Sequence, residues 1–467
     1  MIKNMFSKRI AMLMMSFAAL AAQPMLAQDT DVMEQADGYE WPTDKKVIEK
    51  LNKWEDLKFG VLFHWGIYAV PGICESWPLC NEDWISRDTT VTYQDYKKWY
   101  WRLSKVFNPI KFNPNQWADV MEDAGMKYMI FTTKHHDGFC MFDTKQTTYS
   151  IAQDGPFKNN PQKDVAKYVF KAFHDKDFMI GAYFSKPDWH SQDYWWDYRA
   201  TKDRNVNYNI TRYPQRWENF KGFVYNQIEE LMTGYGDVDI LWLDGGQVCP
   251  QNNQDIDMPR IAKMARSHQP GLLVVDRTIG GKYENYQTPE RSIPAKQLNH
   301  PWESCLPLTG AWGWIPNAHF QPAQKVLSSL IEVVAKGGSM VLGVGPTPEG
   351  LIEPGVIKVL EKVGQWMDVN GKAIYSTTIT PNYNDGEIWF TASKDGKKLY
   401  AIRAVKEGET VPNELEWKGN IPVKGDQVRL VSTGKHLRWK VAGDQVKVYL
   451  PKQVDKTMPV AIEIVKK

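Results

Sequence analysis

Short, continuous apolar runs that alternate with helix-period segments are the strongest constraint on how this 467-residue chain folds. The runs occupy residues 59–63 (FGVLF), 128–133 (YMIFTT), 179–185 (MIGAYFS), 239–243 (DILWL), 272–275 (LLVV) and 339–344 (SMVLGV). Such runs are typical of strands that are buried on both faces of a parallel sheet. Between them, apolar residues recur three and four positions apart, as at Trp117, Val120, Met121 and Ala124. We therefore predict a parallel α/β fold, either an open doubly wound sheet or a closed barrel.

Polar side chains at the ends of these runs favour the closed barrel. They are His64, His135, His136, Tyr183, Ser185, Asp244 and Arg277. In an eight-stranded barrel the carboxyl ends of all strands meet at one rim, where the following loops build the active site. A dinucleotide-binding sheet is disfavoured because no glycine-rich phosphate-binding motif follows the first run. We predict a (β/α)8-like barrel over residues 28–372.

The pattern changes after residue 372 to short segments of alternating apolar and polar residues. Turn signals such as Asp395-Gly396 and Gly443-Asp444 separate some of these segments. We predict a C-terminal antiparallel β-sandwich over residues 373–467. It carries no cluster of catalytic residue types, so a packing role is expected, with auxiliary sugar binding as the alternative.

The N-terminal residues resemble a targeting segment. Basic residues at Lys3, Lys8 and Arg9 precede a short apolar stretch, and small residues follow at Ala21, Ala22 and Ala27. We predict a signal peptide at residues 1–27 and a periplasmic or secreted protein with no membrane anchor after cleavage, because the stretch is shorter than the ~20 residues that span a bilayer.

Composition excludes several classes of partner and site. Lys and Arg total 57 against 55 Asp and Glu, a net charge of +2, so nothing indicates binding to nucleic acid. Five cysteines in a chain this long cannot form a disulfide framework, and their spacing fits no zinc motif. We expect mostly buried thiols, although Cys74 and Cys80 could close a small loop.

Two carboxyl groups stand out as candidates for acid/base and nucleophilic chemistry. Asp244 follows an apolar strand and precedes two glycines, which suits a rigidly held nucleophile. Glu303, expected in a loop, lies beside Trp302, whose apolar face would keep a carboxyl group protonated. Other acids that could serve as the second carboxyl group are Glu75, Asp137, Asp143 and Asp276.

Several stretches in order resemble the α-L-fucosidases of glycoside hydrolase family 29. They are FGVLFHWGIYAVPG, KYMIFTTKHHDGFCMFDTKQTTYSI, DILWLDGG, PWESCLPLTGAWGW, KGGSMVLGVGPTPEGLI and WMDVNGKAIYSTT, within residues 40–380. The resemblance implies an irregular (β/α)8 barrel with a C-terminal β-sandwich. It also implies removal of terminal α-L-fucose from a fucosylated oligosaccharide or glycoconjugate, with retention of configuration and without a metal or other cofactor.

The resemblance also implies roles for individual residues. Asp244 would be the nucleophile that forms a covalent fucosyl-enzyme, and Glu303 would be the general acid/base. The substrate-binding residues would be His64, His135, His136, Tyr183, Trp242 and Arg277. Glu75 and Trp77 would join them, although Ser76 separates this pair, whereas many family members have the acidic and aromatic residues adjacent.

Three other functions remain as alternatives at this stage. One is a related retaining glycosidase that acts on a different sugar, such as a β-galactoside. A second is a glycan-binding protein without activity, and a third is a metal-dependent hydrolase built on His64, His135 and His136. The last is disfavoured because no carboxylate lies at helical ligand spacing from the paired histidines.

Overall fold

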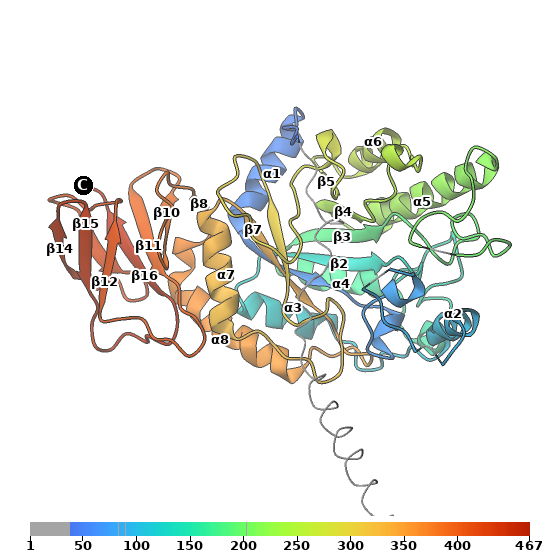
Figure 1. Cartoon of the computed structure of the whole chain (residues 1–467), viewed down its shortest axis with the longest axis horizontal. Coiled ribbons are helices and arrows are strands. Elements are labelled where there is room, and N and C mark those ends of the chain that lie inside the picture. Colours follow the sequence, from blue (N-terminus) through green and yellow to red (C-terminus); the bar gives the residue numbers. More distant parts are fainter. Residues whose placement is uncertain (1–37, 83, 89, 202) are drawn as a thin grey trace, which may run out of the picture. The chain divides into compact units, whose positions relative to one another are not determined.

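A parallel sheet of seven strands forms the centre of the computed structural model, which describes residues 38–82, 84–88, 90–201 and 203–467 (Figure 1). Its strands are hydrogen-bonded in the order β5-β4-β3-β2-β1-β7-β6. Their bounds are β1 Phe59–Phe63, β2 Tyr128–Lys134, β3 Met179–Ser185, β4 Ile240–Asp244, β5 Leu273–Asp276, β6 Glu303–Pro307 and β7 Ser339–Val344. Every residue of β1, β2, β3 and β7 is buried, which explains why these runs show no alternation. The prediction of a parallel, barrel-like α/β fold is confirmed.

An extended segment, residues 284–291, takes the place of an eighth strand in the barrel wall. Strands β5 and β6 do not pair with each other among the described residues. Glu284 forms an antiparallel bridge to β5, and Glu290 forms a parallel bridge to β6. The Gln287 carbonyl accepts a hydrogen bond from the Glu303 amide, at 2.7 Å. The barrel is therefore irregular, with seven regular strands and one irregular segment between β5 and β6.

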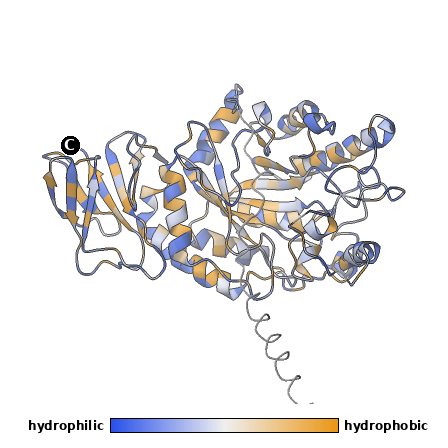
Figure 2. Cartoon of the chain, in the orientation of Figure 1, coloured by the Kyte–Doolittle hydropathy of each residue, from blue (hydrophilic) through white to orange (hydrophobic). Residues whose placement is uncertain are grey.

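Helices that precede or follow the strands cover the outside of the sheet. They are α1 Lys45–Leu57, α2 Tyr93–Arg102, α3 Pro114–Asp123, α4 Val165–His174, α5 Pro214–Gly234, α6 Met258–His268, α7 Ala323–Ala335 and α8 Pro354–Asn370. Figure 2 shows that the helices carry both hydrophobic and hydrophilic residues. N-terminal capping fixes the start of helix α3. The Asn113 side chain accepts a hydrogen bond from the Gln116 amide, and Pro114 occupies the first turn.

The C-terminal region consists of two antiparallel sheets that enclose their own apolar core. One sheet has the order β13-β16-β11-β10-β8 with β9 paired to β10, and the other has the order β12-β15-β14. The strands are β8 Thr377–Thr378, β9 Asn384–Asp385, β10 Ile388–Ser393, β11 Lys398–Arg403, β12 Glu414–Lys418, β13 Gln427–Leu430, β14 Arg438–Ala442, β15 Gln445–Tyr449 and β16 Val460–Val465. The predicted antiparallel sandwich is confirmed. It packs on the barrel helices, where the Trp366 indole of α8 donates to the Pro459 carbonyl, at 2.6 Å.

The structure bears on the predictions for the N-terminal segment, the domain boundary and the cysteines. The predicted signal peptide, residues 1–27, lies outside the described residues. The predicted boundary at residue 372 falls within a short 3-10 helix, Gly371–Ala373, between α8 and the first sandwich strand. All five cysteines are free thiols, and Cys74 and Cys80 form no bridge. In the described part of the chain, every helix is too short or too polar to cross a bilayer.

Candidate active site

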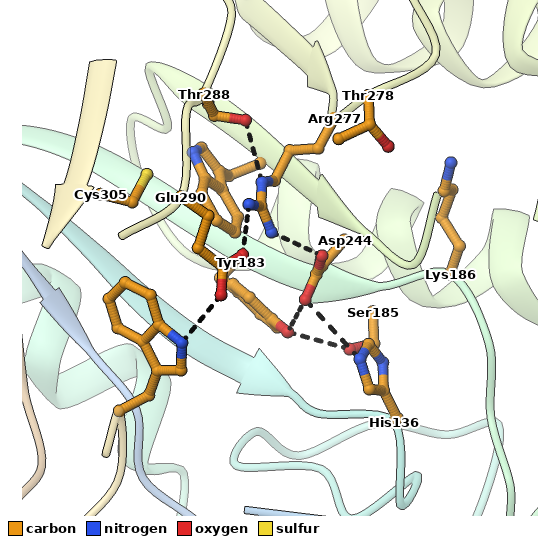
Figure 3. Close-up of polar contacts among 12 residues, drawn as sticks. His136, Tyr183, Ser185, Lys186, Asp244, Arg277, Thr278, Thr288, Glu290 and Cys305 are labelled. Atoms are coloured by element: carbon orange, nitrogen blue, oxygen red, sulfur yellow. Dashed lines mark hydrogen bonds and ion pairs between the residues drawn. The ribbon is translucent and has the colours of Figure 1, made fainter. Parts of the chain in front are cut away.

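The carboxyl ends of β2 to β5 bring a charged cluster together around Asp244 (Figure 3). Asp244 is the last residue of β4, and one of its carboxylate oxygens lies 2.7 Å from the Arg277 guanidinium. The other accepts a hydrogen bond from the Tyr183 hydroxyl, at 2.5 Å, and lies 3.7 Å from His136 Nε2. Arg277 directly follows β5 and Tyr183 belongs to β3, so neighbouring parallel strands position the cluster. The structure thus brings these four predicted site residues together.

This environment keeps Asp244 ionised. Burial alone would raise the pKa of its carboxyl group, but the Arg277 guanidinium, the His136 imidazole and the Tyr183 hydrogen bond together hold that pKa well below its usual range. The carboxylate still keeps an exposed fraction of 18%, so a molecule in the barrel mouth can reach it. A permanently charged, partly open carboxylate is suited to nucleophilic attack.

Glu290 is a second carboxylate of the cluster, and the sequence prediction missed it. One of its oxygens lies 2.8 Å from the Arg277 guanidinium, and the other accepts a hydrogen bond from the Trp312 indole, at 3.0 Å. Figure 3 shows Arg277 between Asp244 and Glu290. The two carboxylates therefore bind the two terminal nitrogens of a single guanidinium. Glu290 belongs to the irregular wall segment, which has no apolar run by which a sequence pattern could place it.

Glu303 occupies a different part of the barrel, so the prediction that it lies in a loop is wrong. It is the first residue of β6, at the amino end of the strand, and its exposed fraction is 0%. Its carboxyl oxygens accept hydrogen bonds from the Tyr128 hydroxyl, at 2.9 Å, and from the Trp242 indole, at 3.2 Å. Tyr128 is the first residue of β2, also at an amino end. Glu303 is therefore enclosed in the barrel interior, away from the rim at which Asp244 and Glu290 lie.

Burial raises the pKa of Glu303 to about 7, although the Tyr128 and Trp242 hydrogen bonds oppose the shift. A carboxyl group with a raised pKa in the folded state stabilises the fold fully below about pH 4.5, and that contribution is lost as the pH rises through about 7. We expect Glu303→Gln to remove this dependence. Relative to wild type, the free energy of unfolding of the variant should rise between pH 4.5 and 7 by on the order of 3 kcal/mol.

Urea denaturation of both proteins across pH 4 to 8 measures that difference. Asp137 and Glu284 also have pKa values raised by burial to about 7, but both are present in each protein and cancel in the comparison. A difference that does not change with pH would contradict the assignment of Glu303 as a buried, titrating group.

Three imidazoles line the same mouth, as predicted. Burial lowers the pKa of His64, His135 and His136, to about 4 for His135, so these rings are neutral near pH 7. The Ser76 hydroxyl lies 2.5 Å from His135 Nδ1. Among the described residues, Nδ1 of His64 and Nδ1 of His136 are buried without a hydrogen-bond partner. Each is therefore a buried polar atom whose hydrogen-bonding capacity no described residue uses.

Glu75 and Trp77 lie in different surroundings although only Ser76 separates them. The Trp77 ring contacts the His136 ring, with centroids 4.9 Å apart, so Trp77 belongs to the mouth. Glu75 is 1% exposed, and its carboxylate accepts a hydrogen bond from the Gly313 amide, at 2.6 Å. This contact ties the loop after β1 to the loop after β6.

Trp242 lies one layer below the carboxylate cluster. It is 1% exposed, its ring stacks on Tyr183 at 5.2 Å, and the Arg277 guanidinium lies over it at 4.3 Å. Because its indole also donates to Glu303, Trp242 separates the buried glutamic acid from the charged cluster. Trp242 therefore lies beneath the Arg277 guanidinium rather than at the open surface of the mouth.

One group of residues has the geometry to hold a metal ion. Ligand atoms of His135, His136 and Asp244 lie within 4.8 Å of one another. However, the guanidinium of Arg277 already lies 2.7 Å from Asp244 and opposes a second cation there by charge repulsion. The arrangement suits a carboxylate nucleophile better than a metal centre.

Comparison with known proteins agrees with this geometry. The sequence profile of the family described as Alpha-L-fucosidase matches residues 26–372. The plasma alpha-L-fucosidase of Homo sapiens is 25% identical over 433 residues, which cover 88% of each chain. The solved structure of alpha-L-fucosidase isoenzyme 1 from Paenibacillus thiaminolyticus is 26% identical, with a TM-score of 0.75 over 91% of this chain and 100% of that one.

A further solved structure shares the fold and has a trapped intermediate. It is a GH29 alpha-L-fucosidase from Bacteroides thetaiotaomicron with a trapped covalent intermediate, 23% identical, with a TM-score of 0.71 over 92% of this chain and 98% of that one. Because the family profile covers most of the sequence, the chain belongs to the GH29 alpha-L-fucosidases, which are glycoside hydrolases.

Proposed function

We propose that this enzyme releases terminal α-L-fucose from fucosylated glycans with retention of configuration, with Asp244 as nucleophile and Glu290 as general acid/base. The observation that carries the proposal is the Arg277 guanidinium, which holds both carboxylates at the barrel mouth. A retaining glycosidase needs two carboxyl groups that face one anomeric carbon, about 5 to 5.5 Å apart. Both side chains keep an exposed fraction, 18% for Asp244 and 11% for Glu290, whereas Glu303 has none.

In the first step, the ionised Asp244 attacks the anomeric carbon while Glu290 gives a proton to the departing glycosidic oxygen. The bond from carbon to that oxygen breaks, and an ester between fucose and Asp244 forms. Arg277 compensates the negative charge of Asp244 through an ion pair and a hydrogen bond, and it remains positively charged throughout. The Tyr183 hydroxyl orients the second carboxylate oxygen.

In the second step, Glu290 removes a proton from a water molecule, which attacks the same carbon and releases fucose and free Asp244. Each displacement inverts the anomeric centre, so the product keeps the α configuration. The neutral imidazoles of His64 and His136 would bind ring hydroxyls of fucose, since His136 Nε2 lies 3.7 Å from Asp244 and the His64 ring lies 5.2 Å from the Tyr183 ring. Trp77 supplies an apolar ring edge beside His136 for the sugar face.

A panel of aryl glycosides tests the proposed function. We expect turnover of the aryl α-L-fucoside that exceeds that of the β-galactoside by at least about 10²-fold, since the hydroxyl partners in the mouth are fixed. Proton NMR taken early in the reaction should show α-L-fucose as the first product. A β anomer appearing first, or a preference for the galactoside, would contradict the proposal.

We also propose that the enzyme works outside the cytoplasm. The support is the basic, apolar and small-residue pattern of residues 1–27, and the family match begins at residue 26. Expression of the full chain in a bacterial host should give a periplasmic protein whose first residue is near position 28. N-terminal sequencing of the fractionated protein measures this, and a cytoplasmic protein that retains Lys3 and Lys8 would contradict export.

A further inference from the structure

The long loop between β3 and α5, residues 186–213, forms a pocket of about 390 Å³ at the carboxyl end of the barrel. In Figure 1 the arrowheads of β2 and β3 point toward this loop. The pocket is of a size that binds small organic groups. Its lining contains asparagine side chains, two tyrosine rings and two arginines, Arg199 and Arg212.

Hydrogen bonds within the loop fix its conformation. The Asn207 amide donates to the Trp196 carbonyl, at 3.1 Å, and its oxygen accepts from the Trp196 amide, at 2.8 Å. The buried indoles of Trp189 and Trp195 donate to the carbonyls of Arg204 and Asn205, at 3.2 and 3.0 Å. These contacts fix the pocket wall in place.

The pocket lining has a net charge of +1, because Arg199 and Arg212 outnumber its one acidic residue. Neither Arg199 nor Arg212 forms an ion pair with another residue in the described part of the chain. The pocket has one acidic residue, Asp203, whose carboxylate accepts a hydrogen bond from the Asn205 amide, at 2.7 Å. The Arg199 guanidinium is held 5.5 Å from the Tyr198 ring centre and donates to the Tyr213 hydroxyl, at 3.2 Å. Arg199 and Arg212 are both exposed, and Arg212 lies 5.6 Å from the Tyr213 ring centre. Two guanidinium groups beside one pocket are suited to a carboxylate or sulfate.

A chain of contacts joins this pocket to the catalytic cluster. His136 lies 3.7 Å from Asp244, and its ring lies against the Trp77 ring. The Arg204 guanidinium covers Trp77 at 4.8 Å from the ring centre, and Asp203 and Asn205, on either side of Arg204 in the chain, line the pocket. Residues 203–205 therefore contact both regions, since Arg204 covers Trp77 and pairs with Glu82, while its two chain neighbours line the pocket.

We infer that this pocket binds an anionic group on the part of the glycan that remains after fucose is released, so that Arg199 and Arg212 determine a preference for acidic fucosylated oligosaccharides. The inference rests on the proposed function. The shared chemistry of the ligand is a group with negatively charged oxygens, which either a carboxylated sugar or a sulfate ester supplies.

The test compares kcat/KM on three substrates: a neutral fucosylated oligosaccharide, the same oligosaccharide with a sialic acid, and the same oligosaccharide with a sulfate ester. Wild type should prefer at least one acidic form by about tenfold or more, and the preference should weaken at high salt. The double variant Arg199→Ala and Arg212→Ala should lose this preference but hydrolyse an aryl α-L-fucoside as wild type does. The acidic form that is preferred identifies the source of the charge.

A matched control variant completes this experiment. Arg438→Ala removes an exposed arginine that also lies on a tyrosine ring, in the β-sandwich, and should leave the preference unchanged. No preference in wild type, or a preference that survives the double variant, would overturn the inference. If no fucoside is hydrolysed at all, the proposed function fails instead, and calorimetry with the acidic oligosaccharide lacking fucose decides the inference. Binding by wild type that the double variant loses supports it, and equal or absent binding overturns it.

Discussion

Replacement of Asp244 by Gly is expected to lower kcat on an aryl α-L-fucoside by at least about 10⁴-fold, because the covalent route is lost with the nucleophile. Added azide should occupy the space of the missing carboxylate and attack the anomeric carbon directly. That single displacement inverts the centre, so the product should be β-fucosyl azide. Steady-state kinetics and NMR of the product measure both effects.

The control for this variant is Asp237→Ala. Asp237 lies just before the amino end of the same strand, and its side chain is 84% exposed, so its loss should leave activity and thermal stability unchanged. The Asp244→Gly protein should also stay folded, although Arg277 and Tyr183 lose a partner. Turnover near the wild-type rate in a folded Asp244→Gly protein would refute the assignment of the nucleophile.

Replacement of Glu290 by Ala is expected to lower kcat/KM by about 10² to 10⁴-fold on natural oligosaccharides, whose leaving groups need a proton. The loss should be much smaller on an aryl fucoside with an acidic phenol. Azide should then attack the fucosyl-enzyme in the second step, so the product should be α-fucosyl azide, opposite to that from Asp244→Gly. The anomer therefore tells the two roles apart.

Glu303→Gln is the matched comparison, since it changes the other candidate carboxyl group without altering the side-chain shape. We expect its activity on both kinds of substrate to stay within about threefold of wild type, because in the described part of the chain the Glu303 carboxyl group hydrogen-bonds to Tyr128, Trp242 and Cys305 inside the barrel. If Glu303→Gln gave the azide rescue and Glu290→Ala did not, the acid/base role would return to Glu303.

Much of the fold was predictable because most barrel strands are largely apolar. The runs at β1, β3 and β7 match the observed bounds, since burial on both faces leaves a continuous signal. Strand β6 gave no such signal, because its sequence ESCLP contains a buried acid, a serine and a proline.

The site was predictable only where a residue ends a regular strand. Asp244 and Arg277 follow apolar runs, so their meeting at one rim follows from parallel topology. Glu290 could not be found in this way, because it belongs to a segment whose place in the wall depends on bridges to β5 and β6. Glu303 has the raised pKa that the neighbouring Trp302 predicts, but it lies in the closed interior of the barrel rather than in a loop.

We propose that Asp244 attacks the sugar while Glu290, which pairs with the same Arg277 guanidinium, donates and accepts the proton. The most direct test of this proposal is to treat the Glu290→Gln variant with an activated 2-fluoro-fucosyl donor, digest the protein and map the label by mass spectrometry. We predict one fucosyl group per chain, attached to Asp244. A label on another carboxylate, or none while the donor is still consumed, would contradict this account.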